Sequence, residues 1–190
     1  MPFNVSFAVY GALPNNNGSA AAAFDVSARL QENLNTLGAS GGILKIGNPI
    51  FFGLDPAPGN TKHFGALVNN RYFACQEGQT INFNSGGGPT SGAPGPATGD
   101  LTVKFAVYGA LPNNESVNAQ AYDVTGLLQA FLNVQGGDVL CGDGLFGDPS
   151  HGYLKHFAAV VTRASEGDFF FACEEGQSIN FSLGGGVRKI

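Results

Sequence analysis

An internal repeat constrains this chain more than any other feature. The decapeptide FAVYGALPNN stands unchanged at residues 7–16 and 105–114. Later in each copy, FACQEGQTINF at 73–83 corresponds to FACEEGQSINF at 171–181, again 98 residues further on. Because the same pattern of apolar and turn residues occurs twice, we expect the chain to build the same structural unit twice.

The repeat divides the sequence into three parts. We predict a first repeat at 1–84, a linker at 85–100 and a second repeat at 101–190. A unit of about 80 residues is long enough for a small domain. The segment between the repeats contains GGGPTSGAPGPATG and has no apolar periodicity, which is typical of a flexible linker.

Within each repeat, the pattern predicts a mainly β (α+β) fold. The segments VSFAVYGAL and LTVKFAVYGAL are rich in β-branched and aromatic residues, and HFGALV with RYFAC has the pattern of a hairpin. Asp25 and Asp123 precede segments with helical periodicity, where a carboxylate can accept from the first free backbone N–H groups. We therefore expect two tandem copies of a small β-sandwich-like domain with one short helix each.

The charge of the chain limits its partners. The formal net charge is -5 and only 12% of residues are charged, with no cluster of Lys and Arg. Because phosphate neutralisation needs such clusters, we expect no nucleic-acid partner. No apolar run approaches 18 residues, so we expect no membrane insertion. A surface made soluble by Asn, Gln, Ser and Thr favours neutral polar ligands.

The cysteines and the N-terminal segment bear on the compartment. Cys75 and Cys173 lie at matching places in apolar runs, and Cys141 is the third cysteine. Their number and spacing indicate neither a disulfide framework nor a zinc site, so we expect buried thiols. The first residues, MPFNVSF, lack a basic stretch and continue directly into the repeat. We expect a cytoplasmic protein, with non-classical release left open.

One loop motif carries most of the chemistry. FGLDPAPGNTKHF at 52–64 and FGDPSHGYLKHF at 146–157 each place a lysine seven residues after an aspartate. Each repeat also has a tyrosine after its first strand and a glutamate in EGQ. Carboxylates accept from hydroxyl pairs, lysine donates to hydroxyl oxygens, and an aromatic ring contacts C–H groups. This set of groups suits a neutral polyol, and it contains no activated nucleophile.

The same residues resemble a known family. CQEG and CEEG, AVYG in both repeats, and the FG(L)DP…G…K loops are similar to the galactose/rhamnose-binding lectin domain first known from sea urchin and fish eggs. A related loop in the C-terminal domain of some DnaJ-like proteins gives a weaker resemblance. The lectin resemblance implies metal-independent sugar contacts at Tyr10, Asn48, Gly53, Asp55, Lys62 and Glu77, and at Tyr108, Asp143, Gly147, Asp148, Lys155 and Glu175.

The chain departs from that family in several ways. The family's disulfides have no counterpart, Leu54 is inserted before Asp55, and Asp143 replaces an asparagine. The Glu-Gly strand closes each repeat here, whereas it opens the family's domain, so we interpret each repeat as a permuted version. His63 and His156 follow the lysines directly. They are included among the candidate sugar contacts, although their alternation with buried positions also fits a structural role.

Each candidate residue also has a structural interpretation. Asp before Pro is an ordinary turn, an Asp–Lys pair can be a simple ion pair, and a tyrosine can be a core aromatic with a satisfied hydroxyl. Co-occurrence of these residues in both repeats favours a functional interpretation.

The leading hypothesis is a tandem-repeat lectin without a cofactor and without enzymatic activity. Its partners would be galactose-type or rhamnose-type glycans on glycoproteins or glycolipids, and two linked sites would give avidity and agglutination. By analogy, it resembles the defence lectins that fungi and some bacteria store inside the cell. The hypothesis leaves open whether the protein forms a homodimer. The alternatives are a protein-interaction or scaffold module, and a glycosidase that uses Asp and Glu.

Overall fold

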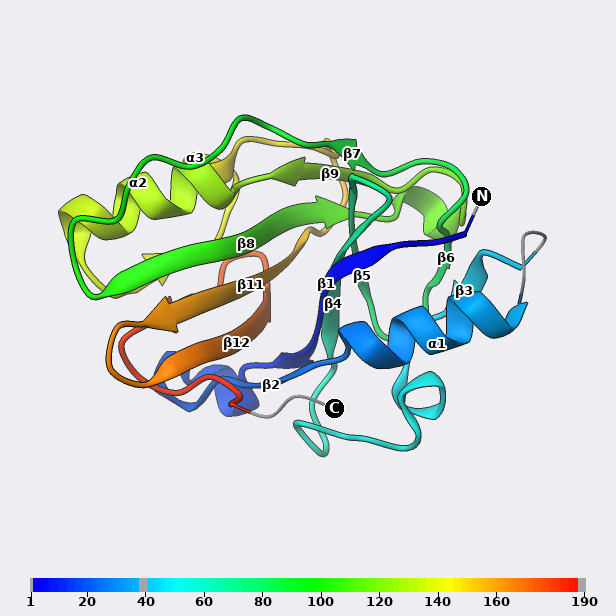
Figure 1. Ribbon diagram of the computed structural model, residues 1–190, viewed down its shortest axis with the longest axis horizontal. Helices are drawn as coiled ribbons and strands as arrows, with labels where there is room; N and C mark the ends of the chain where they lie inside the picture. Colours follow the sequence, from blue (N-terminus) through cyan, green and yellow to red (C-terminus); the bar gives the residue numbers. More distant parts are fainter. Residues whose placement is uncertain (1, 38–40, 188–190) are drawn as a thin grey trace.

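The computed structural model describes residues 2–37 and 41–187 (Figure 1). The first half contains β1 (Val5–Ala12), β2 (Ala22–Asp25), α1 (Ser27–Leu37), β3 (Ile43–Lys45), β4 (His63–Val68), β5 (Arg71–Gln76), β6 (Thr80–Asn82) and β7 (Gly88–Pro89). The second contains β8 (Leu101–Ala110), β9 (Gln120–Asp123), α2 (Thr125–Gln135), β10 (Asp138–Leu140), α3 (Asp143–Phe146), β11 (His156–Arg163), β12 (Gly167–Glu174) and β13 (Ser178–Asn180). Short 3-10 turns are η1 (Pro14–Asn16), η2 (Gly18–Ala20), η3 (Asn48–Phe51) and η4 (Pro112–Asn114). The prediction of a mainly β chain is confirmed.

The helices begin where the sequence indicates. Asp25 Oδ1 accepts from the backbone N–H of Ser27 at 3.0 Å, and Asp123 Oδ1 accepts from that of Thr125 at 3.1 Å. Each aspartate thus binds the first helical N–H group, as expected of a carboxylate before a helix. The second half carries one helix more than predicted, because α3 forms in the segment expected to be a loop.

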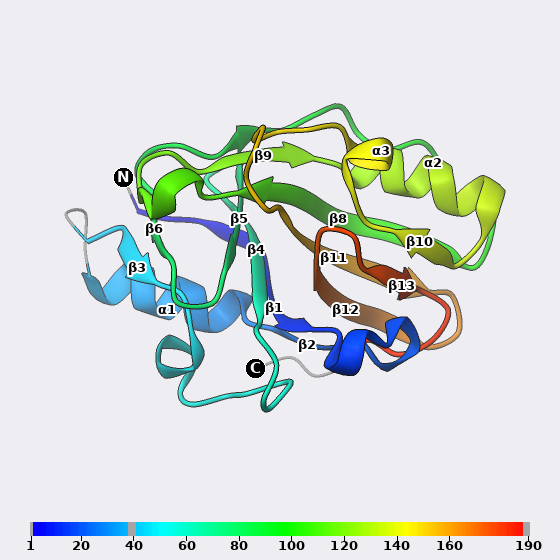
Figure 2. The ribbon, with the colours of Figure 1, turned by 180° about the vertical axis from the view of Figure 1, so that it is seen from behind.

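Two large antiparallel sheets organise the chain (Figures 1 and 2). One has the strand order β2-β1-β4-β5-β7, and the other has the order β12-β11-β8-β9. Small two-stranded sheets, β3-β6 and β10-β13, lie beside them. Tyr10 pairs with Phe64 across β1 and β4, and Tyr108 pairs with Phe157 across β8 and β11. These aromatic pairs belong to the two cores in which the helices are also buried.

Each large sheet has a helix on one face and the other sheet on its opposite face. Val26, Leu30 and Leu34 at α1 are buried in one core, and Val124, Leu128 and Leu132 at α2 are buried in another. A third core between the two sheets contains Val9, Ala74, Phe105, Val107, Ala158 and Phe170. We predicted a β-sandwich within each repeat, but the large sheets instead pack against each other between the repeats, with one sheet from each half. Because each half forms only one large sheet, it has no second large sheet of its own to pack against.

The two halves also exchange short segments. Leu13 and Ala21, which follow β1, pack in the core of the second half, while Leu111 and Ala119, which follow β8, pack in the core of the first. Backbone hydrogen bonds support the exchange: Gly185 N–H donates to the Ala21 carbonyl at 2.8 Å. Each core is completed by residues from the other repeat.

The predicted linker, residues 85–100, makes specific contacts. It contains β7, and the Ser91 hydroxyl donates to Asp123 Oδ2 at 2.9 Å. Further along, Thr98 N–H donates to Asn133 Oδ1 on α2 at 3.0 Å. The segment therefore runs along the second half between its two ends.

The three cysteines are buried free thiols, as predicted. Burial raises the pKa of the Cys75 and Cys173 thiols above the usual range. Within the described ranges, no helix is long and apolar enough to cross a membrane.

Candidate functional site

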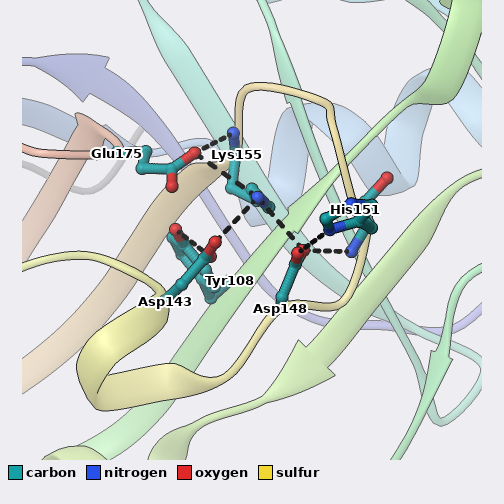
Figure 3. A network of polar contacts seen from close by, with 7 residues as sticks. Tyr108, Asp143, Asp148, His151, Lys155 and Glu175 are labelled. Atoms are coloured by element: carbon teal, nitrogen blue, oxygen red, sulfur yellow. Dashed lines mark hydrogen bonds and ion pairs between the residues drawn. The ribbon is translucent and has the colours of Figure 1, made fainter.

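A buried lysine holds three carboxylates together in the second repeat (Figure 3). Lys155, directly before β11, is only 4% exposed. Its Nζ lies 3.0 Å from Asp143 Oδ2, 3.1 Å from Asp148 Oδ1 and 3.7 Å from Glu175 Oε2. We call these four residues the second cluster. Its three carboxylates and one ammonium give a net charge of -2.

Three separate segments bring these carboxylates to the lysine. Asp143 is the first residue of α3, Asp148 lies in the loop after it, and Glu175 follows β12. Gly147 adopts a φ of 76° between the two aspartates, a conformation that glycine allows at low cost. Backbone bonds between Glu175 and Lys155 fix the third segment: Glu175 N–H donates to the Lys155 carbonyl at 3.0 Å.

A tyrosine lies beneath the second cluster. The Tyr108 hydroxyl donates to Asp143 Oδ1 at 2.9 Å, and its fully buried ring packs on Phe146 with centroids 5.3 Å apart. Burial, and then the hydrogen bond to Asp143, raise the pKa of Tyr108 above its usual range. The hydroxyl therefore stays a donor and orients the carboxylate of Asp143.

The charges of the second cluster support one another. Desolvation works against charge on Asp148, but hydrogen bonds from Lys155 and His151 outweigh it and lower the pKa of Asp148. Desolvation likewise opposes charge on Lys155, yet hydrogen bonds to Asp143 and Asp148 raise its pKa overall. Ionised carboxylates at neutral pH act as hydrogen-bond acceptors only.

The first repeat contains a closely similar arrangement. Lys62, which is 5% exposed, places its Nζ 3.1 Å from Asp55 Oδ1 and 3.4 Å from Glu77 Oε2. The Tyr10 hydroxyl donates to Asn48 Oδ1 at 2.8 Å, as Tyr108 does to Asp143. We call Asn48, Asp55, Lys62 and Glu77 the first cluster. Its net charge is -1, because an asparagine replaces one carboxylate.

The insertion in the first repeat leaves its cluster assembled. Phe52 adopts a left-handed φ of 59°, is 62% exposed and packs under the Arg29 guanidinium at 4.3 Å. Leu54 packs against the first core. The extra length is thus absorbed before Asp55, whose Oδ1 also accepts from Ala57 N–H at 3.1 Å.

The predicted site residues separate into two layers. Lys62, Lys155, Tyr10 and Tyr108 are buried, and they face the protein interior or the acidic groups above them. The acidic side chains reach solvent, with exposures of 37% for Asp143, 29% for Asp148, 26% for Glu175, 29% for Asp55 and 27% for Glu77. Gly53 and Gly147 lie in the exposed loops before the aspartates. The groups available to a ligand are therefore the acidic ones and, in the first repeat, Asn48, which is also partly exposed.

Apolar cavities lie next to the clusters. In the first repeat, Glu77 lines a cavity of about 360 Å³ together with Pro49 and Ile50. In the second, Gly142 and Gly144, the neighbours of Asp143, line a cavity of about 260 Å³ with Leu145. In the first repeat, an acceptor of the cluster thus forms part of the cavity wall, whereas in the second the wall is formed by the chain neighbours of Asp143.

Two predicted residues lie away from the clusters and their supporting loops and tyrosines, and two unpredicted ones lie close to the second cluster. His63 and His156 contact each other at the interface between the repeats, with their Nδ1 atoms 3.0 Å apart. His151, which has no counterpart in the first repeat, lies with Nδ1 3.1 Å from Asp148 Oδ2. Tyr122 packs beside Gly147 and is 45% exposed. In the sequence, Tyr122 stands directly before Asp123, where the first repeat has Phe24 before Asp25. This matching aromatic position is the feature that could have identified Tyr122.

No family model, curated protein or solved structure matches this chain. Among the described residues, no group of three or more His, Cys, Asp or Glu side chains is arranged to hold a metal ion.

Proposed function

We propose that the chain is a tandem duplication that binds neutral carbohydrate through the first and second clusters. The observation that carries the proposal is that, in each repeat, a buried lysine fixes partly exposed carboxylates, with an apolar cavity beside Glu77 in the first repeat and beside the chain neighbours of Asp143 in the second. A sugar presents hydroxyl donors on its edge and C–H groups on its faces. The clusters offer matching acceptors and apolar walls.

The fixed geometry favours a polyol over other ligands. An anion would meet net charges of -1 and -2, whereas sugar hydroxyls donate to ionised carboxylates in charge-assisted hydrogen bonds. Because Lys62 and Lys155 already hold the carboxylates in place, little side-chain freedom is lost on binding. Tyr122, beside Gly147, adds an exposed aromatic face in the second repeat.

Two sites in one chain give the duplication a purpose. Single-site affinity for sugars is modest, since each hydroxyl exchanges water for a protein partner with little net gain. Two clusters on one chain would gain avidity on multivalent glycans and could cross-link them. The resemblance to galactose/rhamnose-binding lectins selects those sugars as first candidates. The buried free thiols fit a reducing compartment such as the cytoplasm.

A glycan array tests this proposal. We expect labelled protein to bind terminal galactose or rhamnose structures, with the signal removed by free galactose or free rhamnose. An array without signal, from protein with a cooperative unfolding transition, would contradict the proposal and favour the protein-interaction alternative. Release of free sugar from an oligosaccharide would instead indicate a glycosidase.

A further inference from the structure

A second kind of cavity lies between the repeats, away from the carboxylate cavities. It has a volume of about 160 Å³, and the His63 side chain forms part of its wall. We call it the interface pocket. Besides His63, its polar lining consists of six residues: Asn15, Asn16, Asn60 and Thr61 from the first repeat and Glu174 and Gln177 from the second.

The lining of the interface pocket is rich in uncharged hydrogen-bonding groups. Four of the six polar side chains are amides, which carry both donors and acceptors, and one is a hydroxyl. Within the described part of the chain, the side chains of Asn15, Asn16 and Thr61 make no hydrogen bond to protein. Gln177 uses its Oε1 to accept from Glu174 N–H at 2.8 Å, which leaves its NH₂ group as a donor.

Backbone conformation directs this lining. Asn15 and Asn16 have φ angles of 53° and 57°, in the left-handed region that asparagine tolerates better than most residues. Asn15 N–H donates to Asn60 Oδ1 at 3.3 Å, which joins the LPNN turn to the loop before Lys62. The turn is therefore held beside the pocket by contacts within the first repeat.

The second repeat shows what a larger residue does at the same place. Asn60 and Tyr153 each stand two residues before the cluster lysine. The Tyr153 hydroxyl donates to Asn113 Oδ1 at 3.0 Å, so a tyrosine contacts the second LPNN turn. In the first repeat, the smaller Asn60 stands there and lines a cavity.

We propose that the interface pocket binds one small neutral polyol, such as a single sugar unit, independently of the two clusters. Its volume is below the roughly 300–1,000 Å³ typical of pockets for drug-sized ligands, which favours a small molecule. Its mixed donors and acceptors match vicinal hydroxyls, and the single carboxylate of Glu174 disfavours anions. Since Glu174 and Gln177 come from the second repeat, a bound polyol contacts both halves.

The test is an amide NMR titration with galactose, rhamnose and glycerol as separate probes. For at least one probe we expect saturable shifts at Asn15, Asn16, Thr61 and Gln177, with a dissociation constant on the order of 1 mM. Asn60→Tyr copies the residue that the second repeat uses and should fill the pocket. It should weaken binding about tenfold or more.

Two further variants make the outcome decisive. Thr61→Val removes the hydroxyl at the position where the second repeat has Leu154. Like Asn60→Tyr, it should weaken binding of the probe. Glu77→Gln/Glu175→Gln alters the two clusters and should leave the pocket shifts unchanged. The inference would be overturned if no probe gave saturable shifts. It would also be overturned if folded Asn60→Tyr and Thr61→Val proteins bound the probe as tightly as the wild type, whatever the glycan array shows.

Discussion

The Nδ1 atoms of His63 and His156 lie 3.0 Å apart, although 93 residues separate them in the sequence. The two rings stack with centroids 5.1 Å apart and an interplanar angle of 18°, and each residue is 3% exposed. One ring must donate its Nδ1 proton to the other, so the accepting ring is neutral and the two histidines cannot both be charged when they form this bond. The contact joins β4 to β11 and thus one repeat to the other.

This histidine pair should make folding sensitive to acid. Burial lowers the pKa of His63 to about 4, and the negative charge of Glu77 opposes this with a smaller effect. Burial, followed by the proximity of His63, lowers the pKa of His156 to about 3. Both values lie below the usual 6.5, so the unfolded chain binds protons first as the pH falls. Stability should therefore decrease between about pH 6.5 and pH 4, by up to about 1.4 kcal/mol per pH unit per histidine.

Denaturant unfolding at several pH values measures this effect. The double variant His63→Gln/His156→Gln should have a flatter stability profile than the wild type between pH 4 and 6.5. His151→Gln provides the control for loss of an exposed histidine: it removes the 3.1 Å contact with Asp148 Oδ2 and leaves the buried pair intact. Parallel profiles for the wild type and the double variant would contradict the assigned role of the pair.

Lys155→Met should destabilise the protein, because it leaves three carboxylates without their cation. Breaking a buried ion pair costs about 3–5 kcal/mol, and partial exposure of the carboxylates reduces our expectation to about 2–4 kcal/mol. The deficit should shrink as the pH falls, since the hydrogen bond from Lys155 helps to lower the pKa of Asp148 and the stability that comes from this lowering is lost in acid.

Equilibrium unfolding compares this variant with Lys104→Met. The Lys104 side chain is 44% exposed and pairs with Asp168 at 2.8 Å, so its loss should cost less than about 1 kcal/mol. Equal effects of the two substitutions would show that the second cluster does not depend on its lysine.

Gly65→Ala should weaken the contact between the two large sheets. A Cβ atom at Gly65 would lie 2.4 Å from Val107 Cγ1 and 2.5 Å from Ala158 Cβ. Overpacking of this kind costs about 1–3 kcal/mol. Gly92→Ala is the control, because nothing lies within 4 Å of its added Cβ. Thermal unfolding of both variants tests the prediction, and an unchanged midpoint for Gly65→Ala would argue against the facing sheets.

Neither half should fold cooperatively by itself. A fragment of residues 1–90 would lack Leu111 and Ala119 from its core, and a fragment of residues 91–190 would lack Leu13 and Ala21. Calorimetry of the separate fragments should show no cooperative transition, and mixing them should restore one. A cooperative transition in either isolated monomeric fragment would instead support independent domains joined by a linker.

The sequence predicts local structure here better than it predicts contacts between the halves. Asp25 and Asp123 indicated the helix starts because a carboxylate acts on the nearest N–H groups. The Asp148–Lys155 contact was also foreseeable, since one short loop carries both residues. The packing of Leu13 and Leu111 in the core of the opposite half was not foreseeable. The sequence shows that an apolar residue follows the strand, but it does not indicate in which core that residue packs. Burial of Tyr108 beneath the cluster depends on packing that no local pattern specifies.

Binding of single-cluster and double-cluster variants to one glycan array tests the central claim most directly. Glu77→Gln and Glu175→Gln each keep the side-chain size and remove the charge of one acceptor. Glu32→Gln, on the exposed face of α1, serves as the control.

If the clusters bind sugar, each single variant should bind with lower avidity than the wild type. The array signal of the double variant should decrease by about tenfold or more. The control should match the wild type. Undiminished binding by a folded Glu77→Gln/Glu175→Gln protein would contradict the account.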